Sequence, residues 1–331
     1  MTTFGDGVFQ YGGSAVGSGM LPVMGQTAIS GPSKAIFVHG ALGADGNPGT
    51  VKAPLKTVTA AYGLCTDGAG DTVYILNDGA SSGSVRDVAL VWAKDNCHLV
   101  GLGAPAINQR ARIAPPTASA VDIDAYTPYF TLSASGCVIS NVSWFQGQSE
   151  DKASVGMYVS GSRNFISNCS IITGASANTA AQAATYQLQV TGSENVFEKC
   201  YIGQDTINRT GANANVRFGA GTAELASRNV FRECIFPCYA SGATALFITA
   251  TTADDAERFN IFERCMFLNT SATAMTGGVV WAAGSGLLFL KDCGFYGCTD
   301  VTAADSTVVL AQGPAGTTNV DVGIFKGIDI A

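Results

Sequence analysis

The sequence predicts one all-β domain, a single-stranded right-handed parallel β-helix with a short N-terminal capping helix. The main observation is a segment that recurs at a nearly constant distance, as NVFEKCYI at 195–202, NVFRECIF at 229–236 and NIFERCMF at 260–267. A fixed period of roughly 20–50 residues is typical of stacked-repeat proteins. The segments between these repeats hold short β-branched and aromatic runs separated by Gly, Asn and Ser, which indicate strands rather than helices.

The composition agrees with this fold and excludes several functions. Charged residues make up only 13% of the chain, while 47% is hydrophobic, so a large apolar core can form. The net charge of −7 comes without clusters of Lys or Arg, which phosphate backbones require, so no nucleic-acid partner is expected. Two histidines and no CxxC pair make a zinc site unexpected, and no cofactor of another kind is indicated.

No targeting or membrane segment is expected from the sequence. The first twenty residues lack a basic stretch followed by an apolar one, which a secretory signal would contain. The longest apolar stretch, near 277–290, is too short and too rich in glycine to span a membrane. We therefore expect a soluble chain that is made in the cytoplasm and has no membrane partner.

Aligning the repeats on their cysteines places like residues in the same columns. The residue three positions before the cysteine is apolar, and in four repeats the residue five positions before it is asparagine. Because parallel coils stack at about 4.7–4.9 Å, like side chains are expected to lie over like. The cysteine column comprises Cys169, Cys200, Cys234, Cys265 and Cys293, and the asparagine column comprises Asn164, Asn195, Asn229 and Asn260.

Each column carries a specific expectation. Asparagine tolerates a left-handed backbone at a bend, and stacked amides can hydrogen-bond along the column. The cysteines are expected to be free buried thiols, although adjacent coils would also bring them close enough for disulfides. The two residues before each cysteine alternate in sign, from Glu198–Lys199 to Lys291–Asp292, which predicts ion pairs between successive coils.

Four parts are expected to follow one another along the chain. They are a Gly-rich N-terminal arm at 1–34, a strand and a capping helix at 35–66, the coils at 67–300, and C-terminal strands or an extension at 301–331. The arm has no strand or helix pattern, and a disordered terminus is the alternative interpretation of it. The residues expected to anchor the arm on a partner surface are Phe4, Phe9 and Tyr11.

The capping helix is expected over 53–65, with Pro54 near its start. A β-helix exposes its core and a strand edge at its open end, and an amphipathic helix would cover both. The expected apolar face of the helix comprises Leu55, Val58 and Tyr62.

The search for catalytic residues gives one weak candidate. Asp122 and Asp124 lie two residues apart, on the same face of a strand at roughly 7 Å, which would suit an acid and base pair for glycoside hydrolysis. No second motif supports this pair, so two surface carboxylates are the alternative and no catalytic set is expected. His98 falls in an apolar column, which predicts a core histidine with satisfied hydrogen bonds.

Two resemblances narrow the fold and the function. The segment that begins IFVHGALGADGNPGT, continues with Pro54, Lys56 and Thr57, and ends in GDTVYIL resembles the start of many pectate-lyase-like right-handed parallel β-helix proteins. The N-terminal FGDGVFQYGGSAVGSGMLP, followed by HLVGLG and RARIAPP, is similar to a group of short tailed-bacteriophage proteins. This second resemblance covers roughly the first 115 residues and implies a β-helix protein associated with the virion, often with the capsid.

These observations lead to one main functional hypothesis and one alternative. The main hypothesis is a non-enzymatic structural protein of a phage virion, a capsid decoration protein of the cement or head-fibre type that is attached through its arm. Its partner would be the major capsid protein or another virion protein, and a homo-oligomer is left open. The alternative is a tailspike-like protein that binds or depolymerises polysaccharide, for which a host glycan would be the ligand.

Overall fold

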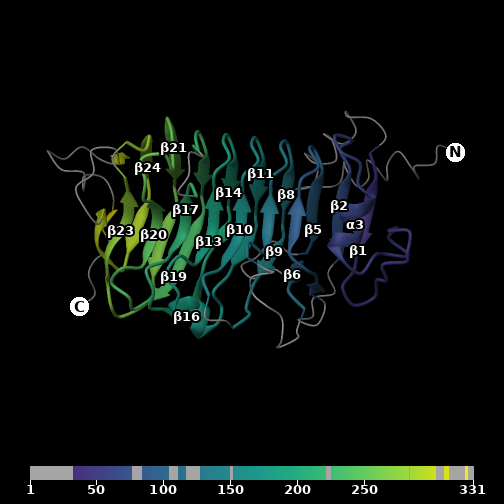
Figure 1. Cartoon of the computed structure of the whole chain (residues 1–331), viewed down its shortest axis with the longest axis horizontal. Coiled ribbons are helices and arrows are strands. Elements are labelled where there is room, and N and C mark those ends of the chain that lie inside the picture. Colours follow the sequence, from purple (N-terminus) through teal and green to yellow (C-terminus); the bar gives the residue numbers. More distant parts are fainter. Residues whose placement is uncertain are drawn as a thin grey trace.

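The chain folds as the parallel β-helix that the sequence predicts, with three sheets around one core. Figure 1 shows successive coils side by side along one long axis, from the end with β1 and α3 to the end with β23 and β24. The computed structural model describes residues 33–76, 84–103, 111–116, 127–149, 152–220, 225–282 and 284–302, and the backbone of 309–312 and 325–326. The predicted arm anchors Phe4, Phe9 and Tyr11 and the acidic pair Asp122 and Asp124 lie outside the described residues.

Each full coil passes through sheet A, then sheet B, then sheet C, and the named strands pair in parallel. Sheet A contains β1 (Ala35–Val38), β2 (Thr72–Leu76), β5 (His98–Leu102), β8 (Val138–Ser140), β11 (Phe165–Ser167), β14 (Val196–Glu198), β18 (Val230–Arg232), β21 (Phe259–Glu263), β24 (Leu287–Lys291) and β27 (Val309–Gln312). Sheet B contains β3 (Val85–Arg86), β6 (Arg112–Ala114), β9 (Ser143–Phe145), β12 (Ser170–Ile172), β15 (Tyr201–Ile202), β16 (Gln204–Arg209), β19 (Ile235–Ala240), β22 (Met266–Asn269), β25 (Gly294–Tyr296) and β28 (Phe325–Lys326). Sheet C contains β4 (Leu90–Trp92), β7 (Phe130–Leu132), β10 (Val155–Val159), β13 (Tyr186–Val190), β17 (Ala214–Phe218), β20 (Leu246–Ala250), β23 (Met275–Trp281) and β26 (Cys298–Thr302).

Aromatic side chains stack along the core in the columns that the repeat alignment predicts. The rings of Phe197 and Phe231 lie 4.5 Å apart at an angle of 3°, and the next ring along, Phe262, lies 4.3 Å from Phe231. In sheet B, Phe267 stacks on both of its neighbours in the same way. The spacing matches the distance between strands, so three successive coils each add one ring to a stack in each of these two columns, and aliphatic residues such as Ile166 and Leu290 continue the first column on either side.

The capping helix is shorter than predicted. Helix α3 covers Val58–Leu64 and begins after Thr57, whose hydroxyl accepts the N–H of Ala60 at 3.1 Å. Leu55 cannot join the helix, because its N–H donates to the carbonyl of Phe37 in β1. Its apolar side chain is nevertheless buried, as is that of Val58, so the predicted capping contact is made by the helix and the segment before it. Neither α3 nor the short α4 (Ala177–Ala181), the helices of the described residues, could cross a membrane.

The asparagine column forms a hydrogen-bonded ladder at the corner between sheets C and A. The side-chain oxygen of each asparagine accepts the backbone N–H of the residue one coil earlier, as Asn229 does from Asn195 at 3.0 Å. Its side-chain nitrogen donates to a carbonyl of that earlier coil, as Asn229 does to Gly192 at 3.0 Å. All four side chains are buried, so the ladder satisfies corner groups that water cannot reach.

The prediction that these asparagines adopt a left-handed backbone is wrong. The positive φ angles belong to residues one or two positions before them, such as Glu194 at 62° before Asn195 and Arg258 at 57° before Asn260. A second set of positive φ angles precedes the cysteines, as at Lys199 and Glu233. At this corner a charged residue at the surface therefore adopts the unusual backbone, and the buried asparagine side chain faces inward.

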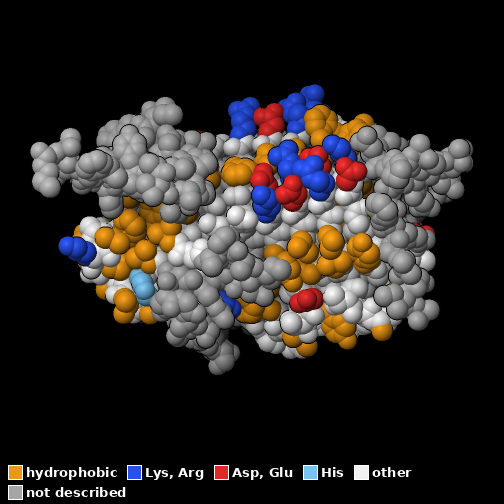
Figure 2. All heavy atoms as spheres, turned by 180° about the vertical axis from the view of Figure 1, so that it is seen from behind, with side chains coloured by type: hydrophobic (Ala, Val, Ile, Leu, Met, Phe, Trp, Pro, Cys, Tyr) orange, Lys and Arg blue, Asp and Glu red, His pale blue; other side chains and the backbone are white. Residues whose placement is uncertain are grey.

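The charged residues before the cysteines form ion pairs from coil to coil, as their alternation predicts. Glu263 lies at the centre and contacts the Nε of Arg232 at 3.2 Å and the Nζ of Lys291 at 2.9 Å. In the neighbouring column Glu233 contacts Arg264 at 3.1 Å. Figure 2 shows the charged side chains of one face gathered into compact bands of both signs. A register shift by one coil would place like charges together, so these pairs favour the native register.

The cysteines of the aligned column are buried and free of disulfides. Their thiols contact carbonyl oxygens of the preceding coil, as Cys234 does with Phe197 at 3.5 Å. Burial raises the pKa of the Cys234 thiol, so it stays protonated and acts as a small apolar group.

A candidate binding groove across sheet B

A groove of about 390 Å³ crosses the outer face of sheet B. Its lining comes from consecutive coils, beginning with Arg112 in β6 and ending with Tyr201 in β15 and the first residues of β16. Three coil steps separate β6 from β15, a span of roughly 14 Å at the spacing of parallel strands. The lining residues are Arg112, Ser143, Phe145, Ile172, Ala175, Tyr201, Gln204, Asp205, Thr206 and Ile207.

Strand register places the floor of the groove. Ser143 pairs with Ser170, which pairs with Tyr201, so these three side chains share one outward-facing column. The residue that follows each of them in its strand, such as Ile171 after Ser170, points into the core instead. The groove therefore uses the side of sheet B that the aromatic stack does not occupy.

One wall of the groove is a bulge. Gln204 pairs with Cys238 and Arg209 pairs with Ala240, so β16 uses more residues than β19 over the same stretch. Gly203, at a φ of 139°, leads into the bulge. A Cβ atom there would come within 2.1 Å of the Pro237 carbonyl oxygen, so only glycine fits this approach.

The side chain of Gln204 holds the start of the bulge. Its oxygen accepts the backbone N–H groups of Thr206 at 2.9 Å and Ile207 at 2.7 Å, and its nitrogen donates to the Ile207 carbonyl at 2.8 Å. Gln204 itself is buried, so these bonds are protected from water. The backbone of the wall is thereby fixed while the side chain of Asp205 remains exposed.

The end of the bulge is held by a buried arginine, Arg209, which is only 3% exposed. Its guanidinium donates to Oδ1 of Asn213 at 2.6 Å, to Oδ1 of Asn215 at 2.7 Å and to the carbonyl of Leu246 at 3.1 Å. Burial lowers the pKa of Arg209, yet its partners here are neutral oxygens. Burying a guanidinium is costly, so this network indicates a strong requirement for the position of the bulge.

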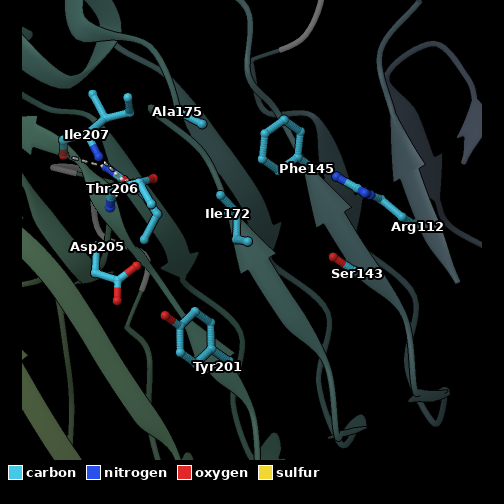
Figure 3. Close-up of a pocket in the computed structure, with 10 residues that line it drawn as sticks. Arg112, Ser143, Phe145, Ile172, Ala175, Tyr201, Asp205, Thr206 and Ile207 are labelled. Carbon is cyan, nitrogen blue, oxygen red and sulfur yellow. Dashed lines mark hydrogen bonds between the residues drawn. The ribbon is translucent and has the colours of Figure 1, made fainter. Parts of the chain in front are cut away.

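Tyr201 and Asp205 make one end of the groove electronegative. Burial, followed by the nearby Asp205 carboxylate, raises the pKa of Tyr201 to about 12, so the phenol keeps its proton and can donate. Figure 3 shows the Asp205 carboxylate and the Tyr201 phenol on the same side of the groove. At the other end the guanidinium of Arg112 lies over the ring of Phe145, at 5.3 Å from its centre.

This arrangement suits binding through hydroxyl groups better than metal chemistry. It offers an aromatic face, a phenol donor, a carboxylate acceptor and a guanidinium, all on a rigid floor. The described residues include no group of three or more His, Cys, Asp or Glu side chains that could hold a metal ion.

His98 departs from its prediction. It is buried, but it lies on the opposite face of β5 from the core residue Leu99. Its Nδ1 accepts the N–H of Val138 at 3.1 Å, whereas its buried Nε2 has no hydrogen-bond partner in the part of the chain that the structure describes. Burial lowers its pKa to about 4, so the ring is neutral near pH 7.

The sequence-based search missed the residues of the groove. The asparagine and cysteine ladders lie within the coils and do not line it, and no motif pointed to Tyr201, Gln204, Asp205 or Arg209. One signal was present: Cys200 and Cys234 are 34 residues apart, while Cys169 and Cys200 are 31 apart. The extra residues of a longer repeat must be accommodated outside the regular strands of its coil. The bulge in β16 lies in this longer repeat, between Cys200 and Cys234.

Comparisons with known proteins support the fold. No protein-family model matches the chain, and a search of curated proteins finds no match. Among solved structures, a rhamnogalacturonan lyase matches with a TM-score of 0.52 and 13% identity over 81% of this chain and 69% of the lyase. A pectate lyase matches with a TM-score of 0.51 and 11% identity over 86% of this chain and 69% of the lyase. A protein of Geobacillus virus E2 is similar at 15% identity over 89% of this chain and 53% of its own, with a TM-score of 0.47.

The chain is therefore a parallel β-helix protein with the architecture that pectin-active enzymes also use. At these identities the likeness describes the fold and leaves activity open, because one fold supports many functions.

Proposed function

We propose that this chain is a non-enzymatic structural protein of a tailed-phage virion, a capsid decoration protein attached through its N-terminal arm. The supporting sequence feature is the resemblance of the first 115 or so residues to short phage proteins. The partner would be the major capsid protein or another virion protein, and the protein would reside in the virion.

The observation that carries the proposal is the unbroken stacking of the described coils. Rings, amides and ion pairs each continue from one coil to the next, as at Phe231, Asn229 and Glu263. Such a scaffold is stiff and holds its two ends at a fixed distance. A rigid rod with a long Gly-rich segment before it suits a protein that is tethered at one end and projects from a surface.

Deletion of residues 1–33, which keeps the hydrogen bond from the Lys34 N–H to the buried Asp71, tests the proposal. The truncated protein should keep its circular dichroism spectrum and its unfolding transition and should no longer co-sediment with phage particles. A triple variant with Phe4, Phe9 and Tyr11 changed to Ala should weaken co-sedimentation without shortening the chain. Undiminished particle binding by the truncated protein would refute attachment through the arm.

The second candidate is a tailspike-like protein that binds or depolymerises polysaccharide, and the groove on sheet B favours it. Release of reducing ends from host surface glycans would identify the depolymerising form. Under the main proposal no reducing ends appear, and Asp122→Asn and Asp124→Asn have no effect on particle binding.

A further inference from the structure

We propose that the Tyr201 end of the sheet B groove binds neutral carbohydrate, with one sugar ring against the tyrosine and its hydroxyls on Asp205. This inference rests on the second candidate function. It gives that function a ligand class and a set of residues, and it requires no cleavage.

The apolar surface for a sugar ring is Tyr201. It lies on the outward face of β15 and is partly exposed, and its ring forms part of the groove lining. The C–H face of a pyranose is apolar and packs on an aromatic ring, while a tyrosine also offers its hydroxyl at the rim. Tyr201 is a rigid platform because its strand is held on both sides, by β12 and by β19.

The hydroxyl acceptor is the carboxylate of Asp205. It is exposed, and no hydrogen bond or ion pair joins it to other side chains of the described residues. Its backbone is fixed by the bonds that Gln204 makes to Thr206 and Ile207. Because the backbone is already fixed, a ligand has to order only the short side chain of Asp205, whose carboxylate can accept two sugar hydroxyls.

The charge at this end of the groove selects neutral ligands. Asp205 repels phosphate and carboxylate groups, and the protonated Tyr201 phenol donates to a hydroxyl or ring oxygen. The guanidinium of Arg112, which could attract an anion, lies at the far end over Phe145. Anionic glycans should therefore be disfavoured where the tyrosine contact is made.

The test uses the full-length protein and an array of neutral and acidic oligosaccharides, followed by calorimetry with the tightest neutral binder. Neutral oligosaccharides should bind, and both Asp205→Asn and Tyr201→Ala should weaken the affinity by about tenfold or more. Tyr201→Phe keeps the ring and should cost less than Tyr201→Ala. The matched control is Asp254→Asn, an exposed carboxylate outside the groove, which should leave binding unchanged.

The outcomes separate the site from the function on which it rests. If a neutral glycan binds and neither Asp205→Asn nor Tyr201→Ala weakens it, the second candidate function stands and this site is refuted. Binding of anionic glycans alone would also refute the site. If no glycan binds, both this site and the second candidate function are refuted. Asp205→Asn changes an exposed side chain, so the test holds even if Tyr201→Ala reduces the yield of folded protein.

Discussion

The side-chain nitrogen of Asn229 donates to the Oδ1 atom of Asn260 at 3.0 Å, although 31 residues separate them. The same oxygen accepts the backbone N–H of Asn229 at 3.1 Å. Each asparagine thus links its own corner to the corner of the next coil, so residues that are one repeat apart in the sequence are in direct contact in the fold.

Asn229→Ala should therefore destabilise the protein by roughly 2–4 kcal/mol. The change leaves the N–H of Asn195 and the carbonyl of Gly192 buried without their partners, and each such group costs about 1–3 kcal/mol. Chemical denaturation measures the loss. The control Asn178→Ala, at an exposed site in α4, should change stability by less than about 0.5 kcal/mol. Equal effects of the two variants would contradict the ladder.

Gly203→Ala should destabilise the fold by roughly 2–4 kcal/mol, because the added methyl group meets the Pro237 carbonyl at 2.1 Å and the φ angle is 139°. Gly63→Ala is the matched control. It lies within α3, where an added Cβ meets nothing within 4 Å, so it should stabilise the protein by about 0.5–1 kcal/mol. Thermal unfolding of the two variants should shift in opposite directions, and a Gly203→Ala protein as stable as the wild type would show that the bulge is placed wrongly.

Glu263 should make stability fall at acid pH. Hydrogen bonds from Lys291 and then Arg232 lower its pKa below the ordinary value of 4.5, so the folded state favours the ionised carboxylate. The resulting stabilisation is present above pH 4.5 and is lost as the pH falls through the lowered pKa of the folded protein. Denaturation at a series of pH values should show that wild type is more stable than Glu263→Gln at pH 7. This difference should shrink as the pH falls from 4.5 through the lowered pKa of Glu263 in the folded protein. A difference that does not depend on pH would contradict this role.

Arg209→Met should cost roughly 2–4 kcal/mol, because Asn213 and Asn215 would each keep a buried side-chain oxygen without its donor. Arg258→Met is the control, since that side chain is 57% exposed and its ion pair with Glu257 is long, at 3.8 Å. Urea denaturation compares the two. If Arg258→Met lowers the free energy of unfolding as much as Arg209→Met does, the buried network stabilises the fold no more than an exposed ion pair.

The repeat could be predicted from the sequence because stacking is a local rule that is applied many times. Phe197, Phe231 and Phe262 occupy one column since each coil must fill the same space in the core as the coil before it. The alternation of Glu198, Arg232 and Glu263 could be predicted for the same reason, because neighbours in the stack meet directly.

The groove could not be predicted, because it depends on a departure from the repeat. Gln204 and Arg209 hold a bulge that no other coil in the described part of the chain shares. Gln204 bonds to the backbone of its own strand, and Arg209 bonds to Asn213, Asn215 and Leu246, so these bonds do not follow the columns of the repeat. The backbone geometry was also assigned to the wrong residue at the corner. Sequence marked Asn195 as the residue for the bend, whereas Glu194 adopts the positive φ and Asn195 makes the hydrogen bonds.

The most direct test of the stacked architecture is a double-mutant cycle on Asn229 and Asn260. Each is changed to Ala alone and both are changed together, and the free energy of unfolding is measured for all four proteins. Direct contact between the side chains predicts a coupling energy of about 1 kcal/mol or more. Additive effects, within about 0.3 kcal/mol, would mean that the two residues do not touch and would contradict the stacking of like on like.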